Sequence, residues 1–421
     1  MTHVVRALLG VAALTALLSG NSRDATLPRS HAPTLPRIAA RPKVLPGIDV
    51  LLADSAHLVD GKRVGLITNQ SGLDASGTPT IDRLARRPGT RLVMLFAPEH
   101  GIRGAARPGE RVSDTTDAVS GLPIYSLYGA RRAPSREQLD RLDVLLLDLQ
   151  DVGARSYTYV STMVLALRAV QSAGKRMVVL DRPNPIGCVM DGPVLDTAYA
   201  SFIGMLPVPL RHGMTMGELA RFANAELGIG ADLVVVPMRG YRRCMWYDET
   251  GLRWVSPSPN MTDLRSAAWY PGLVLFEATN LSVGRGTDAP FRQVGAPWLA
   301  FDRLERADPG IADLVRPATF TPHAPGDGKY DGVPVRGLRL RESRARDAAV
   351  VEGALRLLTA IAAAYPESLV VDSLGMARRL GVPYDPRHPP DCGSDFGDCR
   401  SLWPGQLQAF RRTAMRYLLY R

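Results

Sequence analysis

Runs of apolar residues alternate with amphipathic segments from residue 62 onward. The predicted strands occupy 63–70, 91–101, 144–151, 176–185 and 231–238, and their apolar runs carry the prediction. The segments between them that carry helical spacing occupy 80–87, 135–142, 158–174 and 215–228. Near-continuous apolar runs are typical of parallel strands that are buried on both faces. Their alternation with helices predicts an α/β fold with a Rossmann-like, doubly wound parallel sheet.

Polar pairs follow four of these predicted strands at the point where each strand ends. The pairs are Asn69-Gln70, Glu99-His100, Gln150-Asp151 and Asp181-Arg182. In open α/β sheets, ligands bind outside the carboxyl ends of the strands. Gly101 and Gly104 then allow the loop after His100 to turn tightly. We therefore expect a ligand site at this edge, with Glu99 and His100 facing it.

The second half of the chain is less regular and predicts a smaller α+β domain. Residues 254–263 form a Pro-rich loop, and 272–291 read as a strand that ends at Glu277 and leads into a Gly-rich loop. Four polar residues of that loop are further site candidates: Thr279, Asn280, Arg285 and Thr287. Helices are expected at 347–364 and 406–420, and the aromatic residues of the latter are expected in the core.

The N-terminus predicts export. Residues 1–22 combine one early Arg with an apolar stretch and small residues, which is typical of a signal peptide. Residues 23–44 hold four prolines and predict a linker. The remaining chain is divided into a Rossmann-like catalytic domain at 45–238 and a C-terminal domain at 239–421. No later segment reaches the length of a membrane span.

Composition narrows the chemistry. The chain has 421 residues, 46% hydrophobic, with a net charge of +10 and seven histidines. The positive charge is dispersed and no nucleic-acid module is present. The charge therefore suits an anionic envelope polymer better than nucleic acid, or it reflects only solubility and composition. Among four cysteines, Cys392 and Cys399 are close enough in sequence to pair, and no C-x-x-C spacing indicates zinc.

Motifs for cofactor chemistry are absent from the sequence. There is no P-loop, no dinucleotide fingerprint after the first strand, no nucleophile elbow and no H-E-x-x-H. No cofactor and no metal are therefore expected. Carboxylates, arginines, amides and tyrosines remain, and these are the groups that glycoside hydrolases use.

Seven motifs together resemble one family. They are GLITNQSG, APEHGIRG, DLQDVGARSYTY, LDRPNPIG, RHGMTMGELA, SPSPNM and FEATNLSVGRGT. The family is that of the NamZ-type exo-β-N-acetylmuramidases, formerly domain of unknown function 1343, and the resemblance runs from about residue 45 to the closing RYLLY. It implies a Rossmann-like domain, a smaller C-terminal domain and an active-site cleft between them. It also implies release of N-acetylmuramic acid from the non-reducing end of peptidoglycan fragments, without a cofactor.

Glu99 is the first candidate for the general acid, because a carboxyl group beside apolar residues at a strand end can keep its proton. Glu277 and Asp191 are candidates for the second carboxylate, although the family more often has Glu at the position of Asp191. Asp151 and Asp181 are further possibilities, and the N-acetyl group of the substrate is another. Val283 and Ala278 also depart from the usual family pattern, which has an acidic residue and Gly there.

The lactyl carboxylate of N-acetylmuramic acid calls for a cation, and Arg fits a planar carboxylate best. Arg155, Arg182 and Arg285 are the candidates. Tyr157 and Tyr159 either stack on sugar rings or belong to the core. The remaining candidate substrate contacts are Asn69, Gln70, His100, Asn184, His212, Asn260, Thr279, Asn280 and Thr287.

Two other functions remain open on the sequence. One is a muropeptide-binding protein that has no catalytic activity. The other is an esterase or amidase that uses Glu99 and His100 as an acid/base pair.

Overall fold

The computed structural model describes residues 44–104, 106, 109–110, 113–342, 346, 349–385 and 403–421. The predicted signal peptide, nearly all of the predicted linker, and the Cys392–Cys399 pair lie outside these ranges. No helix within them is both long and apolar enough to cross a membrane. The predicted domain boundary at residues 238/239 stays a prediction.

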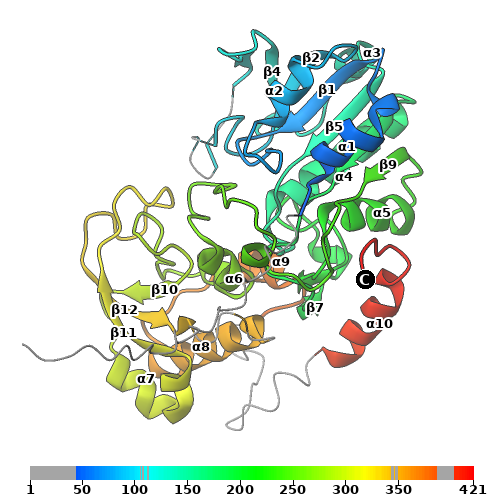
Figure 1. Cartoon of the computed structure of the whole chain (residues 1–421). Coiled ribbons are helices and arrows are strands. Elements are labelled where there is room, and N and C mark those ends of the chain that lie inside the picture. Colours follow the sequence, from blue (N-terminus) through cyan, green and yellow to red (C-terminus); the bar gives the residue numbers. More distant parts are fainter. Residues whose placement is uncertain are drawn as a thin grey trace, which may run out of the picture. The chain divides into compact units, whose positions relative to one another are not determined.

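A seven-stranded sheet organises the first half of the described chain (Figure 1). Its strands in spatial order are β3 (Thr115–Thr116), β4 (Pro123–Ser126), β2 (Arg91–Ala97), β1 (Arg63–Thr68), β5 (Val144–Asp148), β6 (Arg176–Leu180) and β9 (Asp232–Val236). Only β3 runs antiparallel to its neighbour. Counted along the chain, the parallel strands follow the Rossmann order 3-2-1-4-5-6, which reverses between β1 and β5. The predicted Rossmann-like α/β layer is confirmed.

Alternate residues of the central strands enter two separate cores. Leu145 and Leu147 of β5 belong to the core that includes Met163, whereas Val144 and Leu146 belong to the core of the opposite face. The helices of this layer are α1 (Gly47–Asp54), α2 (Thr80–Ala85), α3 (Arg136–Asp140), α4 (Thr158–Ser172) and α5 (Met216–Glu226). Helices α1 and α2 contribute to the second core, and α4 and α5 to the first. Both faces are covered, which explains why the strands lack polar alternation.

Two helices of this layer begin at side-chain caps that the sequence signals. Ser135 and Thr215 form capping boxes at the starts of α3 and α5, each with the Gln or Glu three residues later. Helix α4 begins directly after Tyr157, whose extended backbone turns the chain from the loop after β5. This places the first residues of α4 beside the carboxyl ends of the strands.

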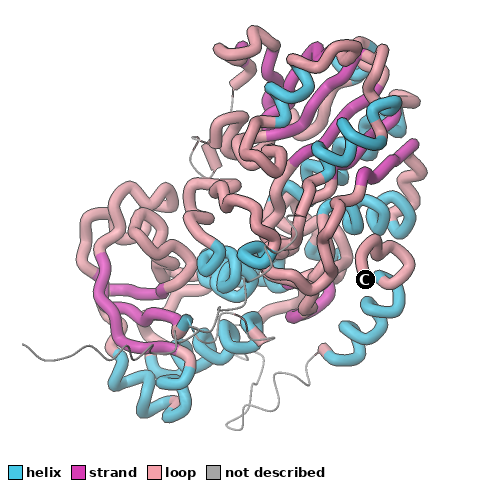
Figure 2. The backbone as a smooth tube through the Cα atoms, viewed as in Figure 1, coloured by secondary structure: helices cyan, strands magenta, loops and turns pink. Residues whose placement is uncertain are grey.

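The C-terminal half combines helices with a small antiparallel sheet, as Figure 2 shows. This sheet has the order β10 (Gln293–Ala296), β12 (Val335–Leu340), β11 (Val315–Phe320). A separate two-stranded ladder, earlier in the chain, joins β7 (Asp191–Val194) to β8 (Pro209–Arg211). The helices are α6 (Leu264–Leu273), α7 (Phe301–Ala307), α8 (Val350–Ala364), α9 (Ser373–Leu380) and α10 (Pro404–Ala414). Short 3₁₀ helices occupy Ala56–Leu58, Thr197–Tyr199, Tyr247–Glu249, Val274–Ala278 (η4) and Pro309–Asp313. Helix α10 ends earlier than predicted, and its Phe410 packs in the core against Phe222.

The predicted strand at 272–277 is wrong. These residues finish α6 and form η4, and the Asp263 side chain accepts a hydrogen bond from the Ser266 N–H at the start of α6 (2.8 Å). Leu273 through Phe276 are all buried. An apolar run without exposed positions shows no period, so it cannot distinguish a buried helix from a buried strand.

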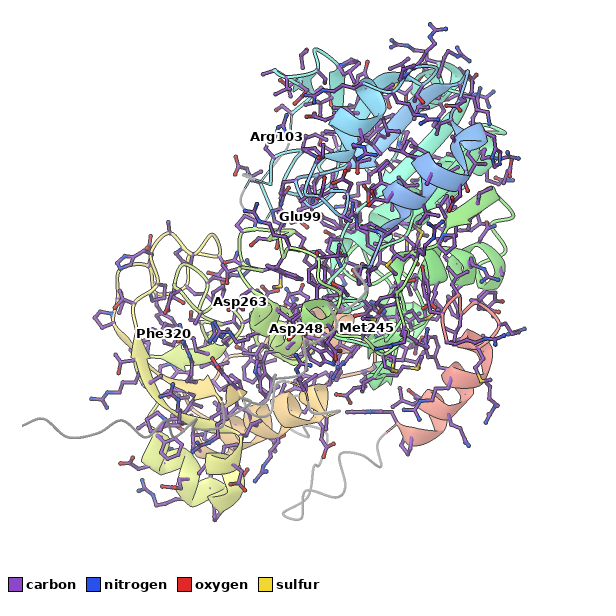
Figure 3. All side chains as sticks on the ribbon, in the orientation of Figure 1. Glu99, Arg103, Met245, Asp248, Asp263 and Phe320 are labelled. Carbon is purple, nitrogen blue, oxygen red and sulfur yellow. A yellow bond between two sulfur atoms is a disulfide. The ribbon has the colours of Figure 1, made fainter. Side chains whose placement is uncertain are left out.

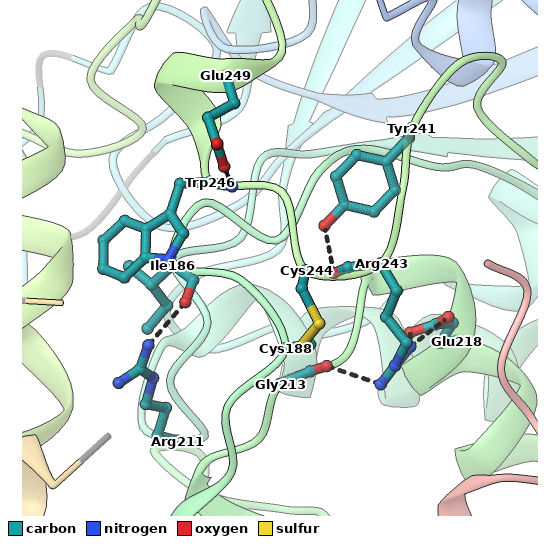
Figure 4. Close-up of a disulfide and its surroundings, with 10 residues drawn as sticks. All are labelled: Ile186, Cys188, Arg211, Gly213, Glu218, Tyr241, Arg243, Cys244, Trp246 and Glu249. Carbon is teal, nitrogen blue, oxygen red and sulfur yellow. Dashed lines mark hydrogen bonds and ion pairs between the residues drawn. A yellow bond between two sulfur atoms is a disulfide. The ribbon is translucent and has the colours of Figure 1, made fainter. Parts of the chain in front are cut away.

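A disulfide joins Cys188 to Cys244 across 56 positions of sequence (Figure 4). It ties the loop after β6 to the segment after β9. Beside it, Arg243 forms an ion pair with buried Glu218 of α5 (2.9 Å) and donates to Gly213 O. No spacing pattern in the sequence indicates this pair, because the two cysteines meet only through the fold.

The last residues of the chain bind to the Rossmann-like layer. The Tyr420 hydroxyl donates to Asp181 Oδ2 (2.6 Å) and accepts from Met238 N (2.9 Å). Leu419 N donates to the Glu218 carboxylate at 2.9 Å. The C-terminus therefore completes the hydrogen bonding of two buried carboxylates that lie far earlier in the sequence.

Candidate active site

A cavity of about 290 Å³ collects charged and aromatic side chains from both halves of the sequence. We call it the main cavity. Of the predicted site residues, it is lined by Glu99, His100, Tyr157, Asn260, Glu277 and Arg285. The loop after β2 supplies the first two, and η4 with the following loop supplies the last two. Its volume lies near the lower end of the range for small-molecule sites.

Glu99 is a buried carboxylate on the loop after β2 (Figure 3). Its Oε2 accepts from the Thr158 hydroxyl at 2.7 Å, and its Oε1 accepts from Gly109 N at 3.2 Å. Burial and the neighbouring Glu99 charge raise the pKa of Tyr128 to about 12, so the Tyr128 hydroxyl stays protonated and can donate to Glu99. Glu99 is thus held in a fixed position at the wall of the cavity.

His100 occupies a backbone conformation that is uncommon for residues other than glycine, with φ 74°. Its Nδ1 lies 2.8 Å from Ala106 O, which requires the proton on Nδ1 and leaves Nε2 as an acceptor. Burial lowers the pKa of His100 although Glu99 opposes this shift. The imidazole is therefore neutral at pH 7 and presents a hydrogen-bonding group beside Glu99.

Glu277 faces the same cavity but in a cationic setting. Its Oε1 accepts from Arg285 Nε at 2.9 Å and also from Nη2, and its Oε2 lies 3.5 Å from Arg379 Nη2. Burial would raise the pKa of Glu277, but Arg285 and Arg379 outweigh burial and hold the pKa below its ordinary value of 4.5. Glu277 is therefore an anion at pH 7 and is not suited to donate a proton.

The lowered pKa of Glu277 predicts a pH-dependent contribution to stability. A group whose folded pKa is depressed contributes stability above its unfolded pKa, and that contribution disappears as the pH falls through the folded pKa. We expect Glu277→Gln to lower the free energy of unfolding by roughly 2 kcal/mol at pH 7, because it leaves the partly buried guanidinium groups of Arg285 and Arg379 without their anion. The difference from wild type should shrink below about pH 4.5. Urea titrations of both chains at several pH values measure it, and a difference that stays constant with pH would contradict the assignment.

Most of the other predicted site residues bind the protein itself. Asn69 donates to the Tyr159 hydroxyl (2.7 Å), which donates to Pro257 O (2.6 Å), and Gln70 donates to Ser256 O (2.7 Å). These bonds fasten the strand edge to the Pro-rich loop. The predicted role of these side chains in substrate contact finds no support in their positions.

Three further predicted residues join the loops after β5, β6 and β8. Asp151 accepts from Gly153 N (2.7 Å) and lies 3.1 Å from His212 Nε2. His212 is fully buried, and Asn184 donates to Met214 O at 2.9 Å. All three lie outside the lining of the main cavity.

Two of the predicted arginines are internal braces. Arg155 is buried and donates to three carbonyl oxygens, those of Pro193, Val208 and Arg379, at 2.7 to 2.9 Å. Arg182 forms an ion pair with buried Asp148 (2.5 Å). Of the arginines predicted from the sequence, Arg285 alone lines the main cavity.

The candidate carboxylates Asp181 and Asp191 also lie elsewhere. Burial raises the pKa of each to about 6. Asp181 accepts from the Thr215 hydroxyl (2.7 Å) and Gly217 N (2.8 Å). Asp191 accepts from Val351 N in the first turn of α8 (2.7 Å). Both carboxylates organise helix starts, which leaves Glu277 as the predicted second carboxylate that the cavity contains.

The three uncharged polar candidates of the Gly-rich loop donate hydrogen bonds to backbone carbonyl oxygens. Thr279 donates to Phe276 O, Thr287 to Gly284 O, and Asn280 to Ser368 O at 2.6 to 2.8 Å. None of them is part of the cavity lining. Their contribution is to place Arg285 opposite Glu277.

Sequence reasoning missed several residues of the cavity. They are Tyr128, Ser156, Thr158, Phe202, Ile203, Ser258, Met261, Tyr270, Val274, Phe291, Gly326, Asp327 and Arg379. Most come from loops or buried helices where no pattern distinguishes a ligand contact. Thr158 could have been found, because it starts the helix that follows the strand-end motif of β5.

Among the described residues, no group of three His, Cys, Asp or Glu side chains is arranged to hold a metal ion. The side chains of the main cavity supply three groups: the buried Glu99 carboxyl group, which is held by hydroxyls, the neutral His100 imidazole, and the ionised Glu277 carboxylate between two arginines. These groups suit acid/base cleavage of an uncharged linkage in a substrate that also carries an anionic group.

Comparisons with known proteins place this arrangement in a family. Sequence models of the N-terminal and C-terminal domains of exo-β-N-acetylmuramidase NamZ match residues 64–265 and 268–420. The chain is 40% identical over 388 residues to the peptidoglycan β-N-acetylmuramidase NamZ of Bacillus subtilis strain 168, covering 91% of this chain and 92% of the relative.

Two crystal structures of Bacteroides fragilis proteins, both of domain-of-unknown-function family 1343, have the same fold. One has a TM-score of 0.81 and 34% identity, covering 91% of this chain and all of the other. The second has a TM-score of 0.74 and 28% identity, covering 90% and 99%. The chain therefore belongs to the NamZ family of exo-β-N-acetylmuramidases.

Proposed function

We propose that this chain removes N-acetylmuramic acid from the non-reducing end of peptidoglycan fragments by hydrolysis of the β-glycosidic bond. Membership of the NamZ family and the name of the Bacillus relative support the reaction class. The observation that carries the proposal is Glu99, a buried carboxyl group at the carboxyl end of β2 that lines the main cavity between Thr158 and Tyr128.

In this proposal Glu99 is the general acid. It protonates the glycosidic oxygen as the bond to the leaving sugar breaks, and the hydroxyls of Thr158 and Tyr128 keep it oriented. Neutral His100, on the same loop, can hydrogen-bond a sugar hydroxyl or the attacking water. Glu277 stays ionised and supplies negative charge that can stabilise an oxocarbenium-like transition state.

The lactyl carboxylate is proposed to pair with the two arginines that flank Glu277. Arg285 is already bonded twice to Glu277, whereas Arg379 contacts Glu277 only at 3.5 Å. The buried Arg379 Nε has no hydrogen-bond partner in the described part of the chain. Arg379 is therefore the better donor for an incoming carboxylate.

The assay that tests the function compares an aryl β-N-acetylmuramide with the matching β-N-acetylglucosaminide. The proposal requires cleavage of the muramide, and release of free N-acetylmuramic acid from fragments that end in this sugar. Binding of these fragments without cleavage would favour a muropeptide-binding protein. Cleavage of ester or amide bonds with the glycosidic bond intact would favour the esterase or amidase alternative.

The role of Arg379 predicts a selective loss of affinity. Arg379→Ala should raise KM for the muramide about 10- to 100-fold, because one or two charge-assisted hydrogen bonds to the carboxylate are lost. The same change should have little effect on an analogue whose lactyl group is an uncharged amide. Arg378→Ala is the matched control, since Arg378 is the exposed neighbour on α9. An equal loss for both substrates would show that Arg379 only supports the fold.

We also propose that the protein acts outside the cytoplasm. The Cys188–Cys244 disulfide supports this location, because disulfides persist in oxidising compartments. In that location, peptidoglycan fragments are the proposed binding partner of the protein. Fractionation of cells that express the full chain tests the location.

A further inference from the structure

A second cavity, of about 200 Å³, lies where the strand order of the seven-stranded sheet reverses. Ser71 and Leu73 follow β1, Gln150 follows β5, and Arg182 follows β6. Open α/β sheets bind ligands at this reversal, outside the carboxyl ends of the strands. The carboxylates assigned to hydrolysis line the main cavity instead. We call this second cavity the switch-point pocket.

Gln150 lines this pocket, and its side-chain oxygen is a buried acceptor without a hydrogen-bond partner among the described residues. Its side chain is 2% exposed, and its Nε2 donates to the carbonyl oxygens of Asp151 and Pro183, both at 2.8 Å. These two bonds fix the amide, because the reversed orientation would set Oε1 against two carbonyl oxygens. Oε1 has no hydrogen-bond partner anywhere in the described ranges. A buried acceptor left in this state is costly, and a ligand hydroxyl or N–H would satisfy it.

Arg182 provides a donor close to that acceptor. Its Nε and Nη2 bind the Asp148 carboxylate at 2.5 and 2.9 Å, and Nη2 also donates to Leu73 O at 2.6 Å. Within the described residues, Nη1 has no acceptor. Gln150 and Arg182 thus offer the pocket an acceptor and a donor on side chains that other bonds hold in place.

The charges around the switch-point pocket are already compensated. Arg182 is paired with Asp148, and Asp74 is paired with Arg83. Arg253 is exposed, so solvent screens its charge. The charged side chains named here therefore give no reason to expect an ionic ligand inside the pocket.

Apolar groups also line the pocket. They belong to Pro46, Leu73, Leu252, Val255 and the ring of Tyr247. A pocket that combines apolar groups with a donor and an acceptor suits a sugar ring, which has hydroxyl groups at its rim and C–H groups on its faces. The volume admits one ring and excludes a dinucleotide.

The geometry points to a binding site for a single uncharged sugar residue in the switch-point pocket, with one hydroxyl or amide N–H donating to Gln150 Oε1 and one oxygen accepting from Arg182 Nη1. The site is separate from the main cavity and does not depend on the proposed hydrolysis. The segment 253–261 lines the switch-point pocket at Arg253 and Val255 and the main cavity at Ser258 and Asn260. A sugar bound at one end therefore touches the same loop as the substrate at the other.

Calorimetric titration of the full chain with N-acetylglucosamine tests the site. Ala75→Trp and Leu252→Trp fill the pocket from two different walls, and each should weaken binding roughly tenfold or more while thermal unfolding shows a folded protein. Ala307→Trp is the matched control on an exposed position of α7. Two filling variants keep the test valid if one of them fails to fold.

A crystal soaked with the same sugar should show it against Gln150 and Arg182. Absence of binding to the wild-type chain, unchanged binding in both filling variants, or sugar density in the main cavity alone would overturn the assignment. Displacement of the sugar by inorganic phosphate would overturn the uncharged character of the ligand. Neither readout requires turnover, so failure of the proposed hydrolysis would not affect the result.

Discussion

Glu99→Gln should reduce kcat about 10²- to 10⁴-fold while the affinity for a muramide fragment stays close to that of the wild type. The amide has the size of the carboxyl group and can keep its contacts with Thr158 and Gly109. It has no acidic proton to deliver to the glycosidic oxygen, so the lost contribution is confined to the transition state. Initial rates on the aryl muramide and calorimetric binding of a non-cleaved fragment measure the two quantities separately.

Glu137→Gln provides the control for this prediction, because Glu137 is an exposed carboxylate on α3. It should leave both kcat and affinity unchanged. Full activity of Glu99→Gln would remove Glu99 from the role of general acid. Activity restored by a better leaving group on the aryl substrate would support that role, since such a group needs less protonation.

Replacement of both Cys188 and Cys244 by Ser should lower the free energy of unfolding by about 4 kcal/mol. The disulfide closes a loop that spans a sequence separation of 56, and the chain-entropy relation assigns this much to a loop of that length. Arg243, beside Cys244, should keep its ion pair with Glu218, because the backbone around it has other bonds. Urea unfolding of the two chains under oxidising conditions gives the difference.

A reductant supplies the internal check on the disulfide. Reduced wild-type protein should unfold like the double Ser variant, and the variant itself should not respond to the reductant. Equal free energies of unfolding for oxidised and reduced wild type would show that the loop is already ordered in the unfolded state.

The strands of the parallel sheet and the polar clusters at their ends could be predicted from sequence because burial on both faces produces continuous apolar runs. Glu99 and His100 were found at one of these ends and do line the main cavity. The same rule failed for Asn69 and Gln70, whose amides bind the backbone of the Pro-rich loop. A polar side chain at a strand end can hydrogen-bond either a ligand or the backbone of a neighbouring loop. The sequence does not show in which direction the side chain points.

The C-terminal contribution to the cavity was harder to predict. The sequence indicates Glu277 as a candidate, although the residues predicted as its strand form a helix, and no sequence pattern indicates Arg379. Arg379 lies beside Glu277, and its carbonyl oxygen accepts a hydrogen bond from Arg155, which stands 224 positions earlier in the sequence. Long-range contacts of this kind leave no local pattern.

The bonds made by the last residues of the chain also govern when folding can finish. The Rossmann-like layer is encoded before residue 240, but the Asp181 carboxylate lacks its Tyr420 donor until residue 420 is available. Residue 420 leaves the ribosome long after the strands of the sheet, because chains emerge from the N-terminal side first. The Rossmann-like layer therefore reaches its final hydrogen bonding only once residue 420 has emerged, well after its own strands have been synthesised.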